Sequence, residues 1–149
     1  ITMAVPYTPS AQITGLYPPV GIDGDYAIGF NGPVYSYGLS QTPAMRATSL
    51  LFLTQVEDGA WSITQTIPPP PLQDGGGNPY DSAWQLAGMN NGVCAAIVSY
   101  FGGGPWLFVY ELESTGSWVL NYSTEVMGGS VQGISVGPTL IAIKYRPLE

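Results

Sequence analysis

The side chains best suited to acid and base chemistry in this sequence are carboxylates. The 149 residues include no histidine, which excludes Ser-His-Asp and Cys-His arrangements and histidine metal sites. A glycosidase needs two acidic side chains flanking one bond. Glu111 and Glu113 stand two residues apart, which in a strand points both to one face, about 7 Å apart. A solvated strand end before the turn at 114–116 is the commoner explanation, and we expect no enzyme.

Two loop-like segments have only part of an ion-binding pattern. Asp23 and Asp25 flank a glycine, but calcium loops need several oxygen ligands in a defined series, and a tight hairpin turn explains this spacing. Segment 74–81 contains Asp, Asn and three glycines, and a flexible loop is the commoner explanation for it. Neither glycine triplet, 75–77 or 102–104, is followed by the Lys-Ser/Thr of a phosphate loop. We expect no metal and no cofactor.

Aromatic side chains are the larger chemical resource, with four Trp, ten Tyr and four Phe. Their flat faces can pack on the C–H side of a sugar ring, while amide, carboxyl and backbone groups bond its hydroxyls. Trp61 and Trp118 occupy a repeated place, so packing inside the fold is their first explanation. Trp84 and Trp106 lie outside that repeat, and we expect them to be exposed contacts. The candidate ligand-binding residues are Trp61, Trp84, Tyr100, Trp106, Glu111 and Trp118.

An internal repeat indicates how these residues are positioned. An Ala-Ile pair with an aromatic residue two or three positions later occurs three times, at 27–30, 96–100 and 142–145. A glycine and an apolar residue precede each pair, at 21–22, 88–89 and 133–134. After the first two copies come an apolar run, 51–53 or 107–109, and then Trp61 or Trp118. Four short strands in succession are the pattern of a propeller blade.

The repeat divides a single all-β domain, residues 1–149, into a half blade at 1–19, blades at 20–72 and 81–127, and a half blade at 128–149. The first half blade would supply third and fourth strands, 1–7 and 11–17, and the last would supply first and second strands. About three blade equivalents cannot close a ring, since propellers have roughly four to eight. We expect a homodimer that closes a six-bladed ring. A piece of a longer propeller and a β-sandwich are the alternatives.

Composition excludes several partners. Three basic and ten acidic residues give a net charge of −7, which argues against nucleic acid and anionic membrane surfaces. No apolar run of about 18 residues is present that could span a bilayer. Gly or Pro interrupts nearly every window of a dozen residues, which disfavours helix. With 45% hydrophobic residues the chain is not of the disordered class.

The single cysteine does not indicate the compartment, and the one glycosylation sequon supports secretion. Cys94 lies in the apolar run 93–97, which indicates a buried structural thiol that no histidine activates. One cysteine allows no disulfide within the chain. Asn121, Tyr122 and Ser123 form a glycosylation sequon. We expect an extracellular or secreted protein.

The segments 96–102, 107–111 and 114–118 resemble a blade of the fungal and bacterial fucose-binding propeller lectins, and 51–61 is similar to the second half of such a blade. FG-GAP-type propeller repeats are similar to the chain through the same Gly-Ile, Gly, Ala-Ile order and the closing tryptophan. The lectin resemblance implies a six-bladed ring built from small chains, with sugars bound between adjacent blades.

The chain departs from that lectin pattern at the sugar site. An arginine in the second strand holds fucose in those lectins, whereas the matching positions here are Gly29, Val98 or Ser99, and Lys144. The resemblance therefore carries over no binding residue. The leading hypothesis is a non-catalytic, carbohydrate-binding, oligomeric propeller. The alternative is a structural subunit of a virion, filament or extracellular layer, whose sparsely charged surface is buried against copies of itself.

Overall fold

The fold consists of antiparallel strands. The computed structural model describes residues 16–34, 47–56, 59–126 and 129–147, and these contain ten strands and no helix. The expectation of an all-β chain is confirmed. Of the two strands expected at 1–7 and 11–17, the first and nearly all of the second lie outside the described residues. None of the described segments is a helix long and apolar enough to cross a membrane.

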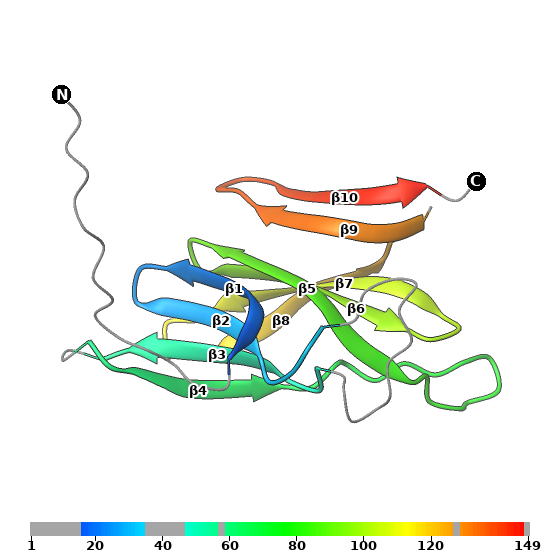
Figure 1. The fold of residues 1–149 in the computed structure, drawn as a ribbon, viewed down its shortest axis with the longest axis horizontal. Helices are drawn as coiled ribbons and strands as arrows, with labels where there is room; N and C mark the ends of the chain where they lie inside the picture. Colours follow the sequence, from blue (N-terminus) through cyan, green and yellow to red (C-terminus); the bar gives the residue numbers. More distant parts are fainter. Residues whose placement is uncertain (1–15, 35–46, 57–58, 127–128, 148–149) are drawn as a thin grey trace.

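The strands form three sheets in which neighbours along the chain are neighbours in space (Figure 1). The first sheet contains β1 (Tyr17–Asp23), β2 (Tyr26–Phe30), β3 (Leu50–Gln55) and β4 (Trp61–Ile67). The second sheet contains β5 (Ser82–Asn90), β6 (Val93–Tyr100), β7 (Gly104–Leu112) and β8 (Trp118–Glu125). The third sheet contains β9 (Gly129–Val136) and β10 (Ile141–Pro147).

Turn residues set the register of the hairpins. Asn90 pairs with Val93, so the β5–β6 turn has two residues, Asn91 and Gly92. Their φ angles are 49° and 78°, and two successive positive values are what a type I′ turn requires. Such a turn matches the twist of the flanking strands. The sequence Asn-Gly therefore fixes where β5 ends and β6 begins.

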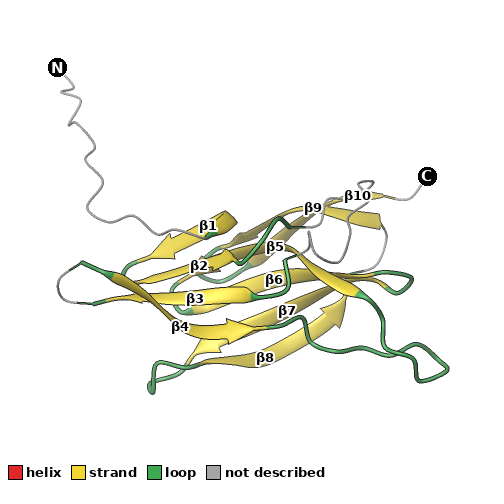
Figure 2. Ribbon diagram, turned by 60° about the horizontal axis from the view of Figure 1, so that its bottom comes forward, coloured by secondary structure: helices red, strands yellow, loops and turns green. Residues whose placement is uncertain are grey.

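The second sheet is the middle layer of the stack (Figure 2). Successive side chains of a strand point to opposite faces, so Cys94 and Val98 of β6 face the first sheet while Ala95 and Ile97 face the third. The first core, between the first and second sheets, includes Phe52. The second core lies between the second and third sheets. Because both of its faces are covered, β6 is apolar from Val93 to Val98 instead of alternating.

The sheets approach each other most closely at their first strands. β1 lies against β5, and β5 lies against β9. A glycine lies at each contact. A Cβ atom placed on Gly21 would lie 3.3 Å from Cγ of Met89, which is tight, whereas one placed on Gly88 would make ordinary contacts of 3.6 Å with Cγ2 of Val136 and 3.9 Å with Cγ2 of Ile134. The stack is therefore narrowest along the row β1, β5, β9.

The Ala-Ile pairs of the sequence repeat do not occupy equivalent positions. Ala27 follows the residue that closes the β1–β2 turn, and the corresponding residue after the β5–β6 turn is Cys94, two residues before Ala96. Ile28 and Ile97 face the sheet that follows their own, whereas Ile143 faces the sheet before it. Which residues are equivalent between the sheets depends on the register of the hairpins. The spacing of the Ala-Ile pairs does not indicate that register.

Candidate functional site

An irregularity in β5 is the starting point of the candidate site. The pairing of β5 with β6 shifts between Trp84 and Leu86, which leaves Gln85 as the extra residue. A β-bulge of this kind re-aims a side chain that regular pairing would point elsewhere. The Gln85 side chain reaches the third sheet and is only 5% exposed.

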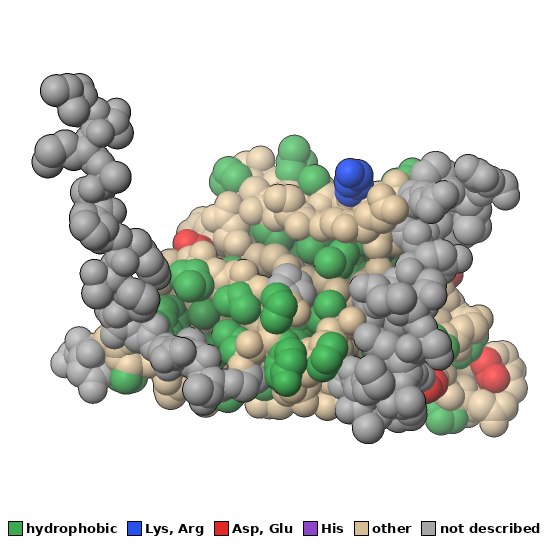
Figure 3. All heavy atoms as spheres, in the orientation of Figure 1, with side chains coloured by type: hydrophobic (Ala, Val, Ile, Leu, Met, Phe, Trp, Pro, Cys, Tyr) green, Lys and Arg blue, Asp and Glu red, His purple; other side chains and the backbone are tan. Residues whose placement is uncertain are grey.

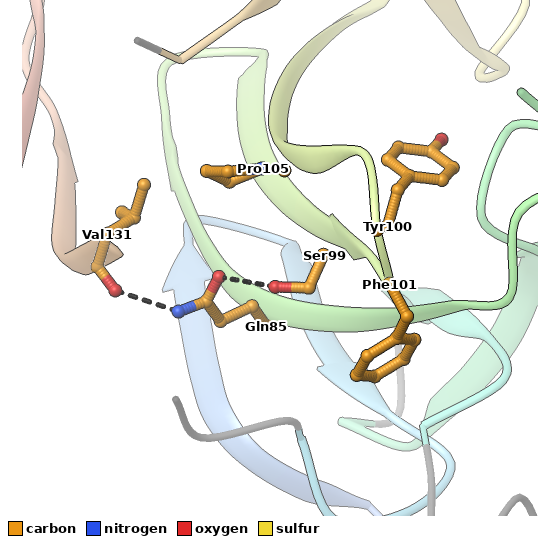
Figure 4. Close-up of a pocket in the computed structure, with 8 residues that line it drawn as sticks. Gln85, Ser99, Tyr100, Phe101, Pro105 and Val131 are labelled. Carbon is orange, nitrogen blue, oxygen red and sulfur yellow. Dashed lines mark hydrogen bonds between the residues drawn. The ribbon is translucent and has the colours of Figure 1, made fainter. Parts of the chain in front are cut away.

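Both ends of the Gln85 amide are bonded (Figure 4). Ser99 Oγ donates to Gln85 Oε1 over 3.0 Å, and Gln85 Nε2 donates to the carbonyl oxygen of Val131 over 2.7 Å. A buried amide left without partners costs about 1–3 kcal/mol, so these bonds make its burial tolerable. They also tie β5 to β6 within one sheet and to β9 in the next.

A cavity of about 230 Å³ lies beside this amide, between the second and third sheets. Its lining consists of Gln85, Ser99, Tyr100, Phe101, Gly102, Gly104, Pro105 and Val131. The rings of Tyr100 and Phe101 point in opposite directions (Figure 4). The Tyr100 ring belongs to the first core, where its hydroxyl donates to the carbonyl oxygen of Pro70. We name this space the Gln85 cavity.

The lining of the Gln85 cavity is neutral. It combines an aromatic ring at Phe101 and the ring of Pro105 with an amide and a hydroxyl group. The second N–H of Gln85 and the lone pairs of Ser99 remain as hydrogen-bonding capacity beyond the two bonds described. The volume is below the roughly 300 Å³ at which pockets for drug-sized ligands begin. A small molecule with hydroxyl groups and one apolar face, such as a single sugar ring, suits this lining.

A second cavity, of about 240 Å³, lies beside the turn between β9 and β10. Glu111 is its only charged lining residue. The other lining residues are Val93, Val109, Val136, Gly137, Pro138, Thr139, Leu140 and Ile141. Glu113, expected to share a strand with Glu111, lies beyond the end of β7 in the following turn. The two carboxylates are therefore not presented by one regular strand.

The expectation that Trp84 is an exposed contact is wrong. Its side chain is 0% exposed, and its ring centroid lies 6.1 Å from that of Phe30 in the first core. The first sheet covers it, a contact that local spacing does not reveal. Its Nε1 is buried without a hydrogen-bond partner. Trp106 is half-buried and stacks on Phe108, with ring centroids 6.3 Å apart.

The repeated tryptophans differ in their surroundings. Trp118 is 3% exposed and stacks on Phe52 of the first sheet at 4.8 Å, with Tyr26 meeting it edge to face. Trp61 occupies the same place in the first sheet, opposite the last residue of β3, but is only partly buried. It packs on the face of the first sheet that points away from the second, against the cluster of Ala27, Leu51 and Leu53.

The structure brings only Tyr100, of the candidate ligand-binding residues, to the Gln85 cavity, and only Glu111 to the second cavity. Sequence reasoning missed Gln85, Ser99 and Phe101. One signal could have found Gln85, because a glutamine between Trp84 and Leu86 interrupts an otherwise apolar strand. The contribution of Val131 depends on the stacking of two sheets and had no local signal.

The segment around Asp74 is organised by its own backbone. Asp74 Oδ1 accepts hydrogen bonds from the amides of Gly76 and Asn78, at 2.8 and 2.9 Å. These bonds lower the pKa of the Asp74 carboxyl. Within the described ranges, no three Cys, Asp or Glu side chains come together as metal ligands would.

Comparison of the chain with protein-family models, with curated proteins and with solved structures found no match. The geometry of the chain itself therefore carries the functional argument.

Proposed function

We propose that this protein is a non-catalytic, carbohydrate-binding protein and that the Gln85 cavity holds one sugar ring. The observation that carries the proposal is the neutral lining, in which Phe101 and Pro105 offer apolar faces beside the Gln85 amide and the Ser99 hydroxyl. Aromatic faces pack on the C–H side of sugars, while amides and hydroxyls bond sugar hydroxyl groups.

The architecture that we propose for it is a β-propeller. Three features support this proposal: each of the first two sheets is a four-stranded meander, the sheets stack face to face, and they approach most closely at their first strands. Blades of a propeller are four-stranded sheets arranged around an axis. In this arrangement the Gln85 cavity lies between two adjacent blades, and β9 and β10 begin a third blade.

A glycan array probed with the purified chain tests the proposal. Hits are expected among neutral glycans. Ser99→Ala and Phe101→Ala should each lower the affinity for the best glycan by about tenfold or more, because each removes one of the contacts that the lining offers. Ser114→Ala, on the exposed turn between β7 and β8, is the matched control and should leave the affinity unchanged.

The results that would overturn the proposal are distinct. An array without a hit, from a sample whose circular dichroism shows folded β-structure, would remove the carbohydrate function. Hits that survive both Ser99→Ala and Phe101→Ala would place the sugar elsewhere on the molecule.

A second function, that of a structural subunit, is favoured by the exposed apolar side chains. Ile22 is 67% exposed and Leu140 is 77% exposed. Assembly into open-ended polymers in solution, together with an empty glycan array, would favour this function over the first.

A further inference from the structure

A glycine of one first strand faces apolar side chains of the next first strand at two boundaries. Gly21 of β1 faces Met89 of β5, and Gly88 of β5 faces Val136 and Ile134 of β9. Met89 directly follows Gly88, and Ile134 directly follows Gly133. At each boundary, a glycine of one sheet therefore packs against the next sheet, at the residue that directly follows a glycine there.

The equivalence of these positions follows from strand pairing. Gly21 lies two residues before Asp23, which closes the β1–β2 turn, and Gly88 lies two residues before Asn90, which closes the β5–β6 turn. Hairpin register therefore supports the equivalence of Gly21 and Gly88. Gly133 lies three residues before Val136, which closes the β9–β10 turn, so its correspondence rests on the Gly-Ile sequence and on the face to which Ile134 points.

A polar contact accompanies the glycine contact at both boundaries. The carboxylate of Asp23 accepts a hydrogen bond from the backbone N–H of Asn91. The side chain of Asn90 donates to the carbonyl oxygen of Val136 over 3.1 Å. Asp23 and Asn90 each end the first strand of their sheet. At both boundaries, the earlier sheet thus contributes a glycine and a polar side chain two residues later to the interface with the next sheet.

Among the described residues, one further copy of each side of this interface has no sheet packed against it. Ile22 occupies the position of Met89, since it pairs with Ala27 as Met89 pairs with Cys94, and it is 67% exposed. It points to the face of the first sheet against which none of the described sheets lies. Figure 3 shows hydrophobic side chains at the surface over the part of the molecule where Figure 1 draws β1 and β2.

The third sheet has the matching surface on its outer face, where no described sheet packs against it. Ile134 faces the second core, so its neighbour Gly133 points to the opposite, outer face. A Cβ atom placed on Gly133 would meet only Cβ of Lys144, at 3.7 Å. Ser135, two residues after this glycine, is exposed. Val136 is the residue that ends β9 and pairs with the first residue of β10, as Asp23 and Asn90 do in their sheets. The outer face of β9 is thus ready to receive a residue such as Ile22.

We propose that the third sheet of one copy stacks on the first sheet of a second copy, with Ile22 of the second copy over Gly133 of the first. The partner surface is therefore a second copy of this chain, and the interface is a third instance of the one found twice inside it. The two surfaces differ, so the contact is heterologous, and it either closes a ring or extends into an open stack. This interface depends on sheet stacking and not on sugar binding.

Disulfide trapping between two different single-cysteine additions tests this interface. Ile22→Cys and Gly133→Cys are made in separate chains, mixed and oxidised. Because a disulfide needs Cα atoms within roughly 7 Å, we expect a cross-linked dimer in the mixture and far less in either variant alone. Cys94 is buried and should not interfere. The internal equivalent, Gly21→Cys with Met89→Cys in one chain, should form an intrachain disulfide and serves as the positive control.

Three outcomes would overturn the proposal. The mixture fails to cross-link while the Gly21 and Met89 control does so; Ile22→Cys cross-links equally well alone, which indicates a symmetric contact; or Ile22→Cys cross-links as readily to an added Ser114→Cys chain. Gly133→Val gives a second measurement, since it should lower the mass seen by analytical ultracentrifugation without lowering thermal stability at high dilution. Glycan binding by a strictly monomeric protein would contradict the interface while leaving the proposed function intact.

Discussion

The side chain of Gln65 bonds the backbone of Trp118 with both of its polar atoms. Gln65 Nε2 donates to the carbonyl oxygen over 2.7 Å, and the N–H of Trp118 donates to Gln65 Oε1 over 2.8 Å. The amide of Gln65 thus makes the same pair of hydrogen bonds with Trp118 that the backbone of a neighbouring strand would make. It joins the fourth strand of the first sheet to the fourth strand of the second, where the two backbones are otherwise far apart.

Gln65→Ala should lower the free energy of unfolding by about 2 kcal/mol, because two hydrogen bonds worth roughly 1 kcal/mol each are lost. Urea denaturation followed by tryptophan fluorescence measures this change. Gln132→Ala, which removes the same side chain from an exposed position on β9, is the control and should change stability by less than about 0.5 kcal/mol. Equal effects of the two substitutions would show that the Gln65 contact contributes nothing.

Tyr110→Phe should stabilise the fold or leave it unchanged. The Tyr110 hydroxyl is buried without a hydrogen-bond partner, and an unsatisfied buried polar group costs about 1–3 kcal/mol. The phenyl ring keeps the edge-to-face contact with Phe52, whose centroid lies 6.1 Å away. Tyr100→Phe is the contrast, since that hydroxyl is bonded to Pro70. A clear loss of stability in Tyr110→Phe would refute this reasoning.

Stability should fall as the pH rises above about 9. Burial raises the pKa of the Cys94 thiol well above its ordinary value of 9.0, and burial, with a smaller effect of Cys94, raises that of Tyr110 from 10.0 to about 12. The folded state then keeps protons that the unfolded state releases, so each group contributes stability that is present below its unfolded pKa and lost above it.

Urea midpoints measured from about pH 7 to about pH 11 should show this decline. The double variant Cys94→Ala with Tyr110→Phe should show a shallower decline. Part of it remains, because burial also raises the pKa of Tyr100. An identical slope in the double variant and the parent would exclude these two groups as its cause.

Gly21→Val and Gly133→Val should differ in their effect on a single chain. A Cβ on Gly21 would lie 3.1 Å from Cγ1 of Ile28 as well as close to Met89, and overpacking of this kind costs about 1–3 kcal/mol. The outer face of Gly133 has room for a side chain. The midpoint of thermal unfolding, measured at high dilution, should therefore be lowered only by Gly21→Val. A comparable drop in the midpoint of Gly133→Val would contradict the assignment of that face as open.

The sequence was sufficient for elements whose structure depends on local residues. Glycine-containing turns, such as the one at Gly92, and the apolar run at 51–53 predicted a turn and a strand that are present. Trp84 was misjudged because its burial depends on contacts with the first sheet, such as the one with Phe30, that are distant in the sequence. Gln85 was missed because a bulge changes the direction of a side chain without changing its residue type.

The register of the three hairpins shows the same limit. The Ala-Ile pairs indicated a repeat but misaligned it, since a shift of two residues preserves the face of every side chain. The third pair, Ala142 and Ile143, is displaced by one face relative to Ala27 and Ile28. Of the glycines that precede these pairs, Gly21 and Gly88 hold equivalent places in hairpin register, and at Gly21 a Cβ would be tightly packed.

Pairing between strands that are consecutive in the chain has a consequence for how the molecule folds. Every ladder in the three sheets joins neighbours along the sequence, so loop closure costs little entropy and each meander can form before the sheets dock. Hydrogen exchange should then reveal separate cooperative units, with the amides of β9 and β10 opening at lower free energy than those of β6, which lies inside a complete sheet and is covered on both faces.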